Sequence, residues 1–153
     1  MSETGQTAPD FTLPRDGGDQ VTLSALRPSP VVLFFYPRDD TSGCTKESLA
    51  FTALQAEFQA AGATVMGISK DTVAKHEKFR DKHELGVPLL SDAESDICEQ
   101  YGVWKEKSMY GKKFWGIERS TFLIDSTGQI ARVWRKVKVP GHAEEVLEAV
   151  KSL

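Results

Sequence analysis

The chain has 153 residues, 40% hydrophobic and 27% charged, which suits one folded domain over residues 1–153 and excludes a disordered chain. Its 22 acidic and 19 basic residues give a net charge of −3, which argues against nucleic acid as a main partner. No apolar run approaches the roughly 20 residues that cross a bilayer, and no export signal opens the chain. We therefore expect a cytoplasmic protein that does not bind membranes.

The first half of the chain predicts strands alternating with helices. Two short extended pieces, Asp10–Leu13 and Gln20–Leu23, form an N-terminal extension. The run Val31–Tyr36 is continuously apolar, as in a strand that is covered on both faces. Apolar residues at helical spacing then predict a helix over about 43–61, and residues 63–69 predict a second long strand.

The alternation continues through the middle of the chain. A helix over about 72–84 precedes a short strand at 88–91, and a capping-box pattern predicts a short helix that ends near Tyr101. The segment Lys105–Phe114 is polar and punctuated by glycine, so it is predicted to be a solvated loop. Its lysines suggest an alternative role, the docking of an acidic reductase.

The end of the chain decides the fold class. Ser120–Asp125 and Gln129–Val137 flank a turn signal and predict a hairpin, and an amphipathic helix follows over about His142–Ser152. Alternating strands and helices predict an α/β sheet with helices on both faces, and the hairpin makes that central sheet mixed. This order of elements is expected for a thioredoxin-like fold.

The cysteines and histidines limit the chemistry. Two cysteines, Cys44 and Cys98, are too few for a disulfide scaffold or a four-cysteine metal site. The histidines show no metal-ligand spacing, and we expect His76 and His83 to lie on a helix surface or at an interface. We therefore expect no metal and no bound cofactor, so a thiol is the first candidate for chemistry.

Cys44 stands where a thiol can be activated. It lies in the first turn of a predicted helix, just after a buried strand, where unpaired N–H groups and the helix dipole favour the thiolate. One turn earlier, the Thr41 hydroxyl can donate to the sulfur or to a bound oxygen, or it can cap the helix. Pro37 offers an apolar face that shields the sulfur from water. Such a thiolate is suited to attack an O–O bond, whose leaving oxygen is stabilised by preorganised donors.

The spacing Pro37-x-x-x-Thr41-x-x-Cys44 resembles the peroxiredoxin signature. Further segments along nearly the whole chain are similar to the bacterioferritin-comigratory (PrxQ) branch, among them Phe34-Phe-Tyr-Pro37, Gly43-Cys-Thr-Lys-Glu47, Tyr101-Gly-Val-Trp104 and Arg119-Ser-Thr-Phe-Leu-Ile-Asp125. The resemblance implies a thioredoxin fold and the reduction of hydrogen peroxide or organic hydroperoxides. It implies that Cys44 is the peroxidatic cysteine, oxidised to a sulfenic acid, with Thr41, Pro37 and Arg119 completing the site and Arg119 supplying positive charge.

The chain departs from the branch in two respects. Ser42 stands where the branch usually has proline. Some members carry a resolving cysteine five residues after the peroxidatic one, where this chain has Leu49. Others carry it in the next helix, where this chain has Arg80. Cys98 matches neither position. We therefore expect a one-cysteine cycle in which thioredoxin, glutaredoxin or a small thiol reduces Cys44. A two-cysteine cycle with Cys98 as the resolving residue remains the alternative.

Other functions use the same thiol. A non-catalytic redox sensor would oxidise Cys44 but turn over poorly. A thioredoxin-type disulfide reductase is disfavoured because Thr41-Ser-Gly-Cys44 lacks the first thiol of that motif, and no histidine has a spacing that singles it out as the base of a hydrolase. We expect a monomer or a weak homodimer.

Overall fold

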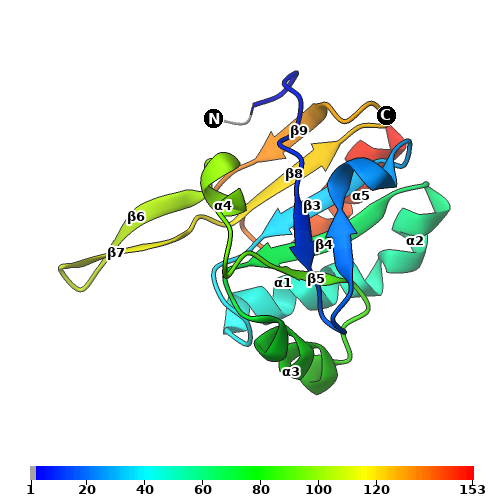
Figure 1. The fold of residues 1–153 in the computed structure, drawn as a ribbon. Coiled ribbons are helices and arrows are strands. Elements are labelled where there is room, and N and C mark those ends of the chain that lie inside the picture. The colour runs from blue at the N-terminus through cyan, green and yellow to red at the C-terminus, as the bar shows by residue number, and fades with distance from the viewer. Residues whose placement is uncertain (1–2) are drawn as a thin grey trace.

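The computed structural model describes residues 3–153 and is built on a five-stranded mixed sheet (Figure 1). The strand order is β5-β4-β3-β8-β9, in which β3, β4 and β5 run parallel while β8 is antiparallel to both β3 and β9. The strands are β3 (Val31–Phe35), β4 (Thr64–Ser69), β5 (Leu89–Ser91), β8 (Ser120–Ile124) and β9 (Ile130–Trp134). The predicted mixed α/β sheet is confirmed.

Helices and short strands cover the two faces of this sheet (Figure 1). One face carries α1 (Ser42–Ala53), α2 (Gln55–Ala60), α3 (Val73–His83) and α5 (His142–Lys151). The other carries β1 (Thr12–Pro14), β2 (Gln20–Thr22), the 3₁₀ helix Leu23–Leu26 and α4 (Ile97–Gln100). The single helix predicted over 43–61 is two helices in the structure. The backbone of Leu54 (φ −101°, ψ 4°) leaves the helical conformation between them.

The central strand divides the core into two clusters. Side chains along β3 alternate between the faces, so Leu33 and Phe35 join one cluster and Val32 and Phe34 join the other. Cys98 belongs to the cluster of Leu33, and Cys44 belongs to the cluster of Phe34. The two cysteines therefore lie on opposite faces of the sheet.

The segment predicted as a loop at Lys105–Phe114 is a hairpin instead. Strands β6 (Trp104–Met109) and β7 (Lys112–Ile117) pair antiparallel and project from the body of the molecule (Figure 1). Tyr110 and Gly111 form its two-residue turn, both with positive φ (52° and 77°), as hairpins of this length require. The sequence shows no apolar–polar alternation there because most side chains on both faces are exposed. None of the helices within residues 3–153 has the length and apolar character needed to cross a bilayer.

Candidate active site

Cys44 is the third residue of α1, directly beyond the loop that follows β3. Thr41 is the N-cap residue of α1 with extended backbone (φ −90°, ψ 155°), and its carbonyl accepts the first helical hydrogen bond from Thr45 N–H at 2.8 Å. No side chain caps the helix, and its first turn carries no acidic residue. The amides and the positive end of the helix dipole at this terminus therefore act on Cys44 without a competing carboxylate.

Arg119 contacts the sulfur of Cys44. Its Nη2 lies 3.3 Å from Sγ and can donate a hydrogen bond to it. Arg119 sits between β7 and β8, and because Ser120 pairs with Phe35, the guanidinium reaches the end of β3 where α1 begins. A Cβ at Gly43 would stand only 3.1 Å from Arg119 Nη2, so the glycine permits this close approach.

Glu47 forms an ion pair with Arg119, and the sequence analysis did not single it out. It lies one turn after Cys44 on α1, and its Oε1 accepts a hydrogen bond from Arg119 Nη1 at 2.6 Å. The carboxyl is 1% exposed, and burial, opposed by the charge of Arg119, raises the pKa of Glu47 to about 7. Its second oxygen, Oε2, has no hydrogen-bond partner among the described residues. An acid three residues after the cysteine was the available signal.

The other two predicted residues lie on the loop before α1. The Thr41 hydroxyl donates to the Arg38 carbonyl at 3.0 Å, and its side chain is exposed. Pro37 is half-buried at the start of the same loop. The structure thus joins Cys44 and Arg119 directly and places Thr41 and Pro37 on the adjoining loop.

A buried hydrogen-bond network anchors that loop from behind. Asp39 accepts hydrogen bonds from the Tyr36 hydroxyl and from His76 Nδ1, both at 2.7 Å, and its own N–H donates to Asp71 at 2.8 Å. His76 Nε2 lies 2.9 Å from the Leu90 carbonyl, so both ring nitrogens of His76 contact oxygen atoms of other segments.

This network corrects one expectation. His76 was expected at a helix surface, but it is 0% exposed because it bonds to groups from two other segments. Among the described residues, Asp39, Asp71 and His76 also bring ligand-type atoms within 4.8 Å of one another. Asp71 and His76 also hydrogen-bond Asp39 of the loop, so the group ties that loop to β4 and α3.

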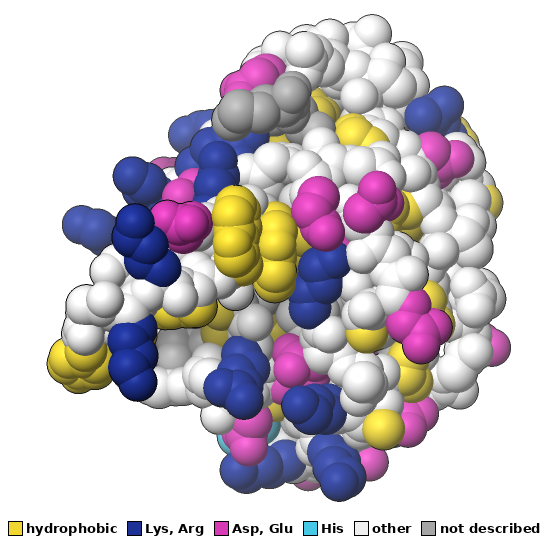
Figure 2. Space-filling view, turned by 60° about the vertical axis from the view of Figure 1, so that its left-hand side comes forward, with side chains coloured by type: hydrophobic (Ala, Val, Ile, Leu, Met, Phe, Trp, Pro, Cys, Tyr) yellow, Lys and Arg dark blue, Asp and Glu magenta, His cyan; other side chains and the backbone are white. Residues whose placement is uncertain are grey.

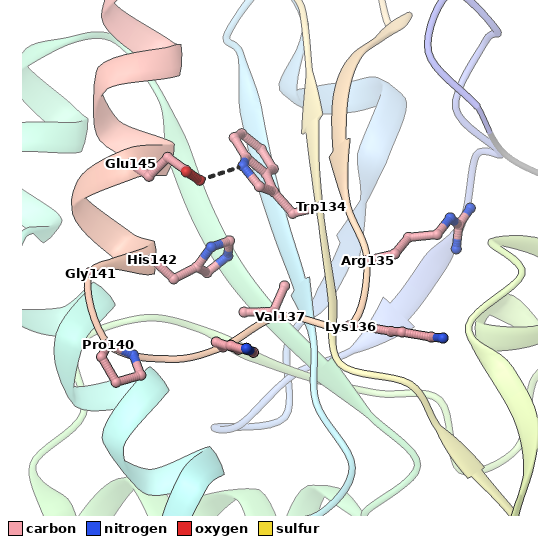
Figure 3. A pocket seen from close by; sticks show the side chains of 9 residues that line it. Trp134, Arg135, Lys136, Val137, Pro140, Gly141, His142 and Glu145 are labelled. Carbon is pink, nitrogen blue, oxygen red and sulfur yellow. Dashed lines mark hydrogen bonds between the residues drawn. The ribbon is translucent and has the colours of Figure 1, made fainter.

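A cavity of about 410 Å³ lies beside the segment that follows β9 (Figure 3). Its wall is the segment from Trp134 to the start of α5, where Val137 N–H donates to the Arg119 carbonyl at 3.0 Å. The Trp134 indole donates to Glu145 at 3.0 Å, and burial lowers the pKa of His142 to about 4, leaving the imidazole neutral at pH 7. The hydrogen bond from Val137 ties the backbone of Arg119 to the segment that lines the cavity.

Cys98 has a different setting. It is 0% exposed, and its backbone N–H donates to the Asp92 carboxylate at 2.8 Å. Burial, and after it the negative charge of Asp92, raises the pKa of the Cys98 thiol. Because the central sheet separates it from Cys44, the structure does not bring the two cysteines together.

Sequence comparison finds a family and close relatives. Residues 4–133 match the AhpC/TSA family. A putative peroxiredoxin bcp from Coxiella burnetii is 52% identical, over 95% of this chain and 96% of the relative. The peroxiredoxin Bcp of Bacillus subtilis is 45% identical, over 99% of this chain and 96% of the relative.

Solved structures agree with these relatives. The bacterioferritin comigratory protein of Xanthomonas campestris superposes with a TM-score of 0.91 at 45% identity, over 98% of each chain. A mutant PrxQ of Xylella fastidiosa superposes with a TM-score of 0.94 at 42% identity, over 99% of this chain and 97% of that one. These likenesses confirm the expected thioredoxin-type peroxiredoxin fold. The chain therefore belongs to the AhpC/TSA family as a peroxiredoxin of the Bcp type, a thiol-dependent peroxidase.

Proposed function

We propose that this peroxiredoxin reduces hydrogen peroxide and organic hydroperoxides through Cys44 in a one-cysteine cycle. The observation that carries the proposal is the 3.3 Å contact between Cys44 Sγ and Arg119 Nη2 at an uncapped helix N-terminus. For organic substrates, the proposal draws on the Xanthomonas campestris relative, whose structure concerns its alkyl peroxide reduction activity.

In the oxidation step, the Cys44 thiolate attacks one oxygen of the O–O bond. An S–O bond forms, the O–O bond breaks, and the leaving oxygen takes a proton to depart as water or an alcohol. Cys44 becomes a sulfenic acid, oxidised by two electrons. Negative charge moves from sulfur to oxygen during this step, and a guanidinium beside the sulfur stabilises it at both ends.

Each neighbouring residue has a proposed part. Glu47 positions the guanidinium, because its hydrogen bond to Nη1 directs Nη2 towards the sulfur. Thr41 lies at the helix start, where its hydroxyl can turn from the Arg38 carbonyl to a bound peroxide. Pro37 shields the site from water. Cys44 is 0% exposed and Arg119 16% exposed, so a peroxide enters as the exposed side chains around the sulfur shift.

The reducing step requires a thiol from outside the chain. An external thiolate attacks the sulfenic sulfur, releasing water and forming a mixed disulfide, and a second thiol then displaces Cys44 as its thiolate. What supports an external reductant is the position of Cys98 across the sheet, against Asp92. Thioredoxin, glutaredoxin or a small thiol would serve a monomer or weak homodimer in the cytoplasm, where thiols are kept reduced.

Peroxide consumption with dithiothreitol tests this function directly. We expect Cys44→Ser to lose more than about 10³-fold in rate, because Cys98, the other cysteine, is buried and has a raised pKa, and Cys98→Ser to stay within about twofold of the parent. A Cys44→Ser variant as active as the parent would refute the peroxidase site. Loss of turnover in Cys98→Ser, with its unfolding midpoint unchanged, would instead establish the two-cysteine cycle.

A further inference from the structure

The β6–β7 hairpin presents an unusual amount of uncovered apolar surface. Of the six large hydrophobic residues that are exposed in the described chain, four lie on this hairpin: Met109 at 57%, Tyr110 at 97%, Phe114 at 42% and Trp115 at 58%. Within residues 3–153, β6 and β7 pair with no other strand. Exposed aromatic residues gathered in this way typically mark a binding surface.

The two faces of the hairpin differ in charge. The pairing of Lys105 with Gly116, Lys107 with Phe114 and Met109 with Lys112 places these residues on one face, with three lysines and no acid. We call the residues Lys105, Lys107, Met109, Lys112 and Phe114 the basic face. The opposite face includes Glu106, which pairs with Lys113 at 3.9 Å, and it also carries Trp115.

The basic face reaches the end of β7, close to Arg119. Lys107 donates a hydrogen bond to the Ile117 carbonyl, two residues before Arg119. Burial and the Arg119 charge lower the pKa of Lys107 while Cys44 opposes them, so this lysine lies within electrostatic reach of both active-site groups. On the opposite face, Ile117 is buried in the core, which anchors that side of the hairpin base. Figure 2, with the hairpin side turned forward, shows hydrophobic and basic side chains together on this region.

Charge complementarity indicates what kind of partner fits. The hairpin holds four lysines and one glutamate, a net charge of +3, in a chain whose overall charge is −3. Within residues 3–153, no carboxylate pairs with Lys105 or Lys112. A surface with both positive charge and apolar side chains binds an acidic protein surface with an apolar centre.

We propose that the basic face docks a protein thiol reductant of the thioredoxin type, through an acidic surface around its reactive thiol. This inference rests on the proposed function, because a protein thiol reductant is needed only if peroxide oxidises Cys44. Docking beside Arg119 would bring the reductant's thiol to the Cys44 sulfur.

Neighbouring residues on the two faces give matched pairs for the test. Turnover is measured at saturating hydrogen peroxide with thioredoxin, kept reduced by thioredoxin reductase and NADPH. We expect Lys112→Glu to raise the KM for thioredoxin about 5-fold at low salt and less at high salt, and Lys113→Glu to change it less than about twofold. Phe114→Ser should likewise raise KM about 5-fold, and Trp115→Ser less than about twofold.

Several results would overturn the docking proposal. Equal effects within each pair, or no effect in either, would show that the basic face has no part in docking. Turnover with dithiothreitol but with neither thioredoxin nor glutaredoxin would exclude a protein reductant. A dimer of the parent in analytical ultracentrifugation that Lys112→Glu dissociates would assign the face to a second copy of this chain.

A separate measurement distinguishes failure of docking from failure of the peroxidase itself. With dithiothreitol as reductant, and in single-turnover oxidation by peroxide, all four variants should match the parent within about twofold, because a small thiol does not use a docking surface. If the parent consumes no peroxide with dithiothreitol, the proposed function fails. If it does and the matched pairs behave alike, only the docking proposal fails.

Discussion

The two cysteines have the same exposure and opposite surroundings. Both are 0% exposed, so burial does not distinguish them. Cys44 lies 3.3 Å from a guanidinium nitrogen, whereas the amide of Cys98 is bound by the Asp92 carboxylate at 2.8 Å. A neighbouring cation favours a thiolate, and a neighbouring anion opposes it. We propose that the adjacent cation allows Cys44 to react, whereas burial and, after it, the Asp92 carboxylate raise the pKa of Cys98.

The helix termini at the two cysteines show the same contrast. At α4, Asp92 accepts the N–H groups of Ile97 and Cys98 at 3.1 and 2.8 Å, so a carboxylate already occupies that terminus. At α1, no side chain caps the helix, and its amides stay available to an anion at or near Cys44. The amides at the start of α4 are thus bound by a carboxylate, whereas those at the start of α1 can stabilise a Cys44 thiolate.

Removing the cation should have the largest effect on this contrast. We expect Arg119→Met to lower the second-order rate of Cys44 oxidation about 10²-fold, because the charge that stabilises thiolate and leaving oxygen is lost. Stopped-flow measurement of peroxide reduction gives this rate. Arg132→Met is the control, since its guanidinium stacks over Trp134 away from the sulfur, and it should stay within about twofold. An Arg119→Met rate equal to that of Arg132→Met would contradict the role of the cation.

Glu47, which pairs with Arg119 beside Cys44, should make the stability of the protein depend on pH. Its pKa is raised to about 7 in the folded protein, so the native state holds a proton that the unfolded chain releases near its ordinary value of 4.5. Stability should therefore fall as pH rises through this window. Relative to Glu47→Gln, the parent should lose about 2 kcal/mol of unfolding free energy between about pH 5 and pH 8.

Urea denaturation of both proteins at the two pH values measures this difference. The comparison removes the pH dependence that all other groups contribute, because those groups are present in both chains. A difference that stays constant across the window would show that Glu47 ionises in the folded protein as it does in water.

The loop anchor should have a smaller effect. Asp39→Asn removes the buried carboxylate that Tyr36 and His76 share, so we expect about 1.5 kcal/mol less unfolding free energy and about 10-fold slower Cys44 oxidation. Asp40→Asn is the matched control, because the neighbouring Asp40 is exposed and bonds only to Lys82 and His83 among the described residues. Equal effects of the two variants would show that the network does not position the loop.

The smallest effect concerns Cys98. Asp92→Asn removes the adjacent negative charge but leaves the burial, which is the larger cause of the raised pKa of this thiol. Oxidation of Cys98 by peroxide should change less than about twofold, measured by peptide mass mapping. A much faster reaction at Cys98 would mean that charge alone keeps it inert.

The sequence predicts the core better than the hairpin. The apolar run Val31–Tyr36 and the amphipathic helix at the end of the chain carry strong patterns because their side chains are buried, and both are confirmed. The hairpin at 104–117 carries no such pattern, because most of its side chains are exposed and they lie on both faces. The glycine of its two-residue turn, Tyr110-Gly111, was the feature of the sequence that could have indicated a hairpin.

Contacts between distant segments account for what the sequence does not show in the site. Thr41, Cys44 and Pro37 stand close together in the chain, so local spacing reveals them, and Arg119 is predicted only through a family resemblance. The spacing of Glu47 from Cys44 places it near the thiol, but its partner Arg119 lies 72 positions away, and local spacing does not identify that partner. His76 likewise looks like a surface residue until Asp39 and the Leu90 carbonyl meet it.

The most direct test of the charge contrast is a single oxidation followed by mass mapping. The parent protein is treated with one equivalent of hydrogen peroxide in the presence of dimedone, which traps sulfenic acids, and digested without reduction. The predicted result is one dimedone adduct on Cys44 and unmodified Cys98. A disulfide between the two cysteines, or an adduct on Cys98, would contradict the account.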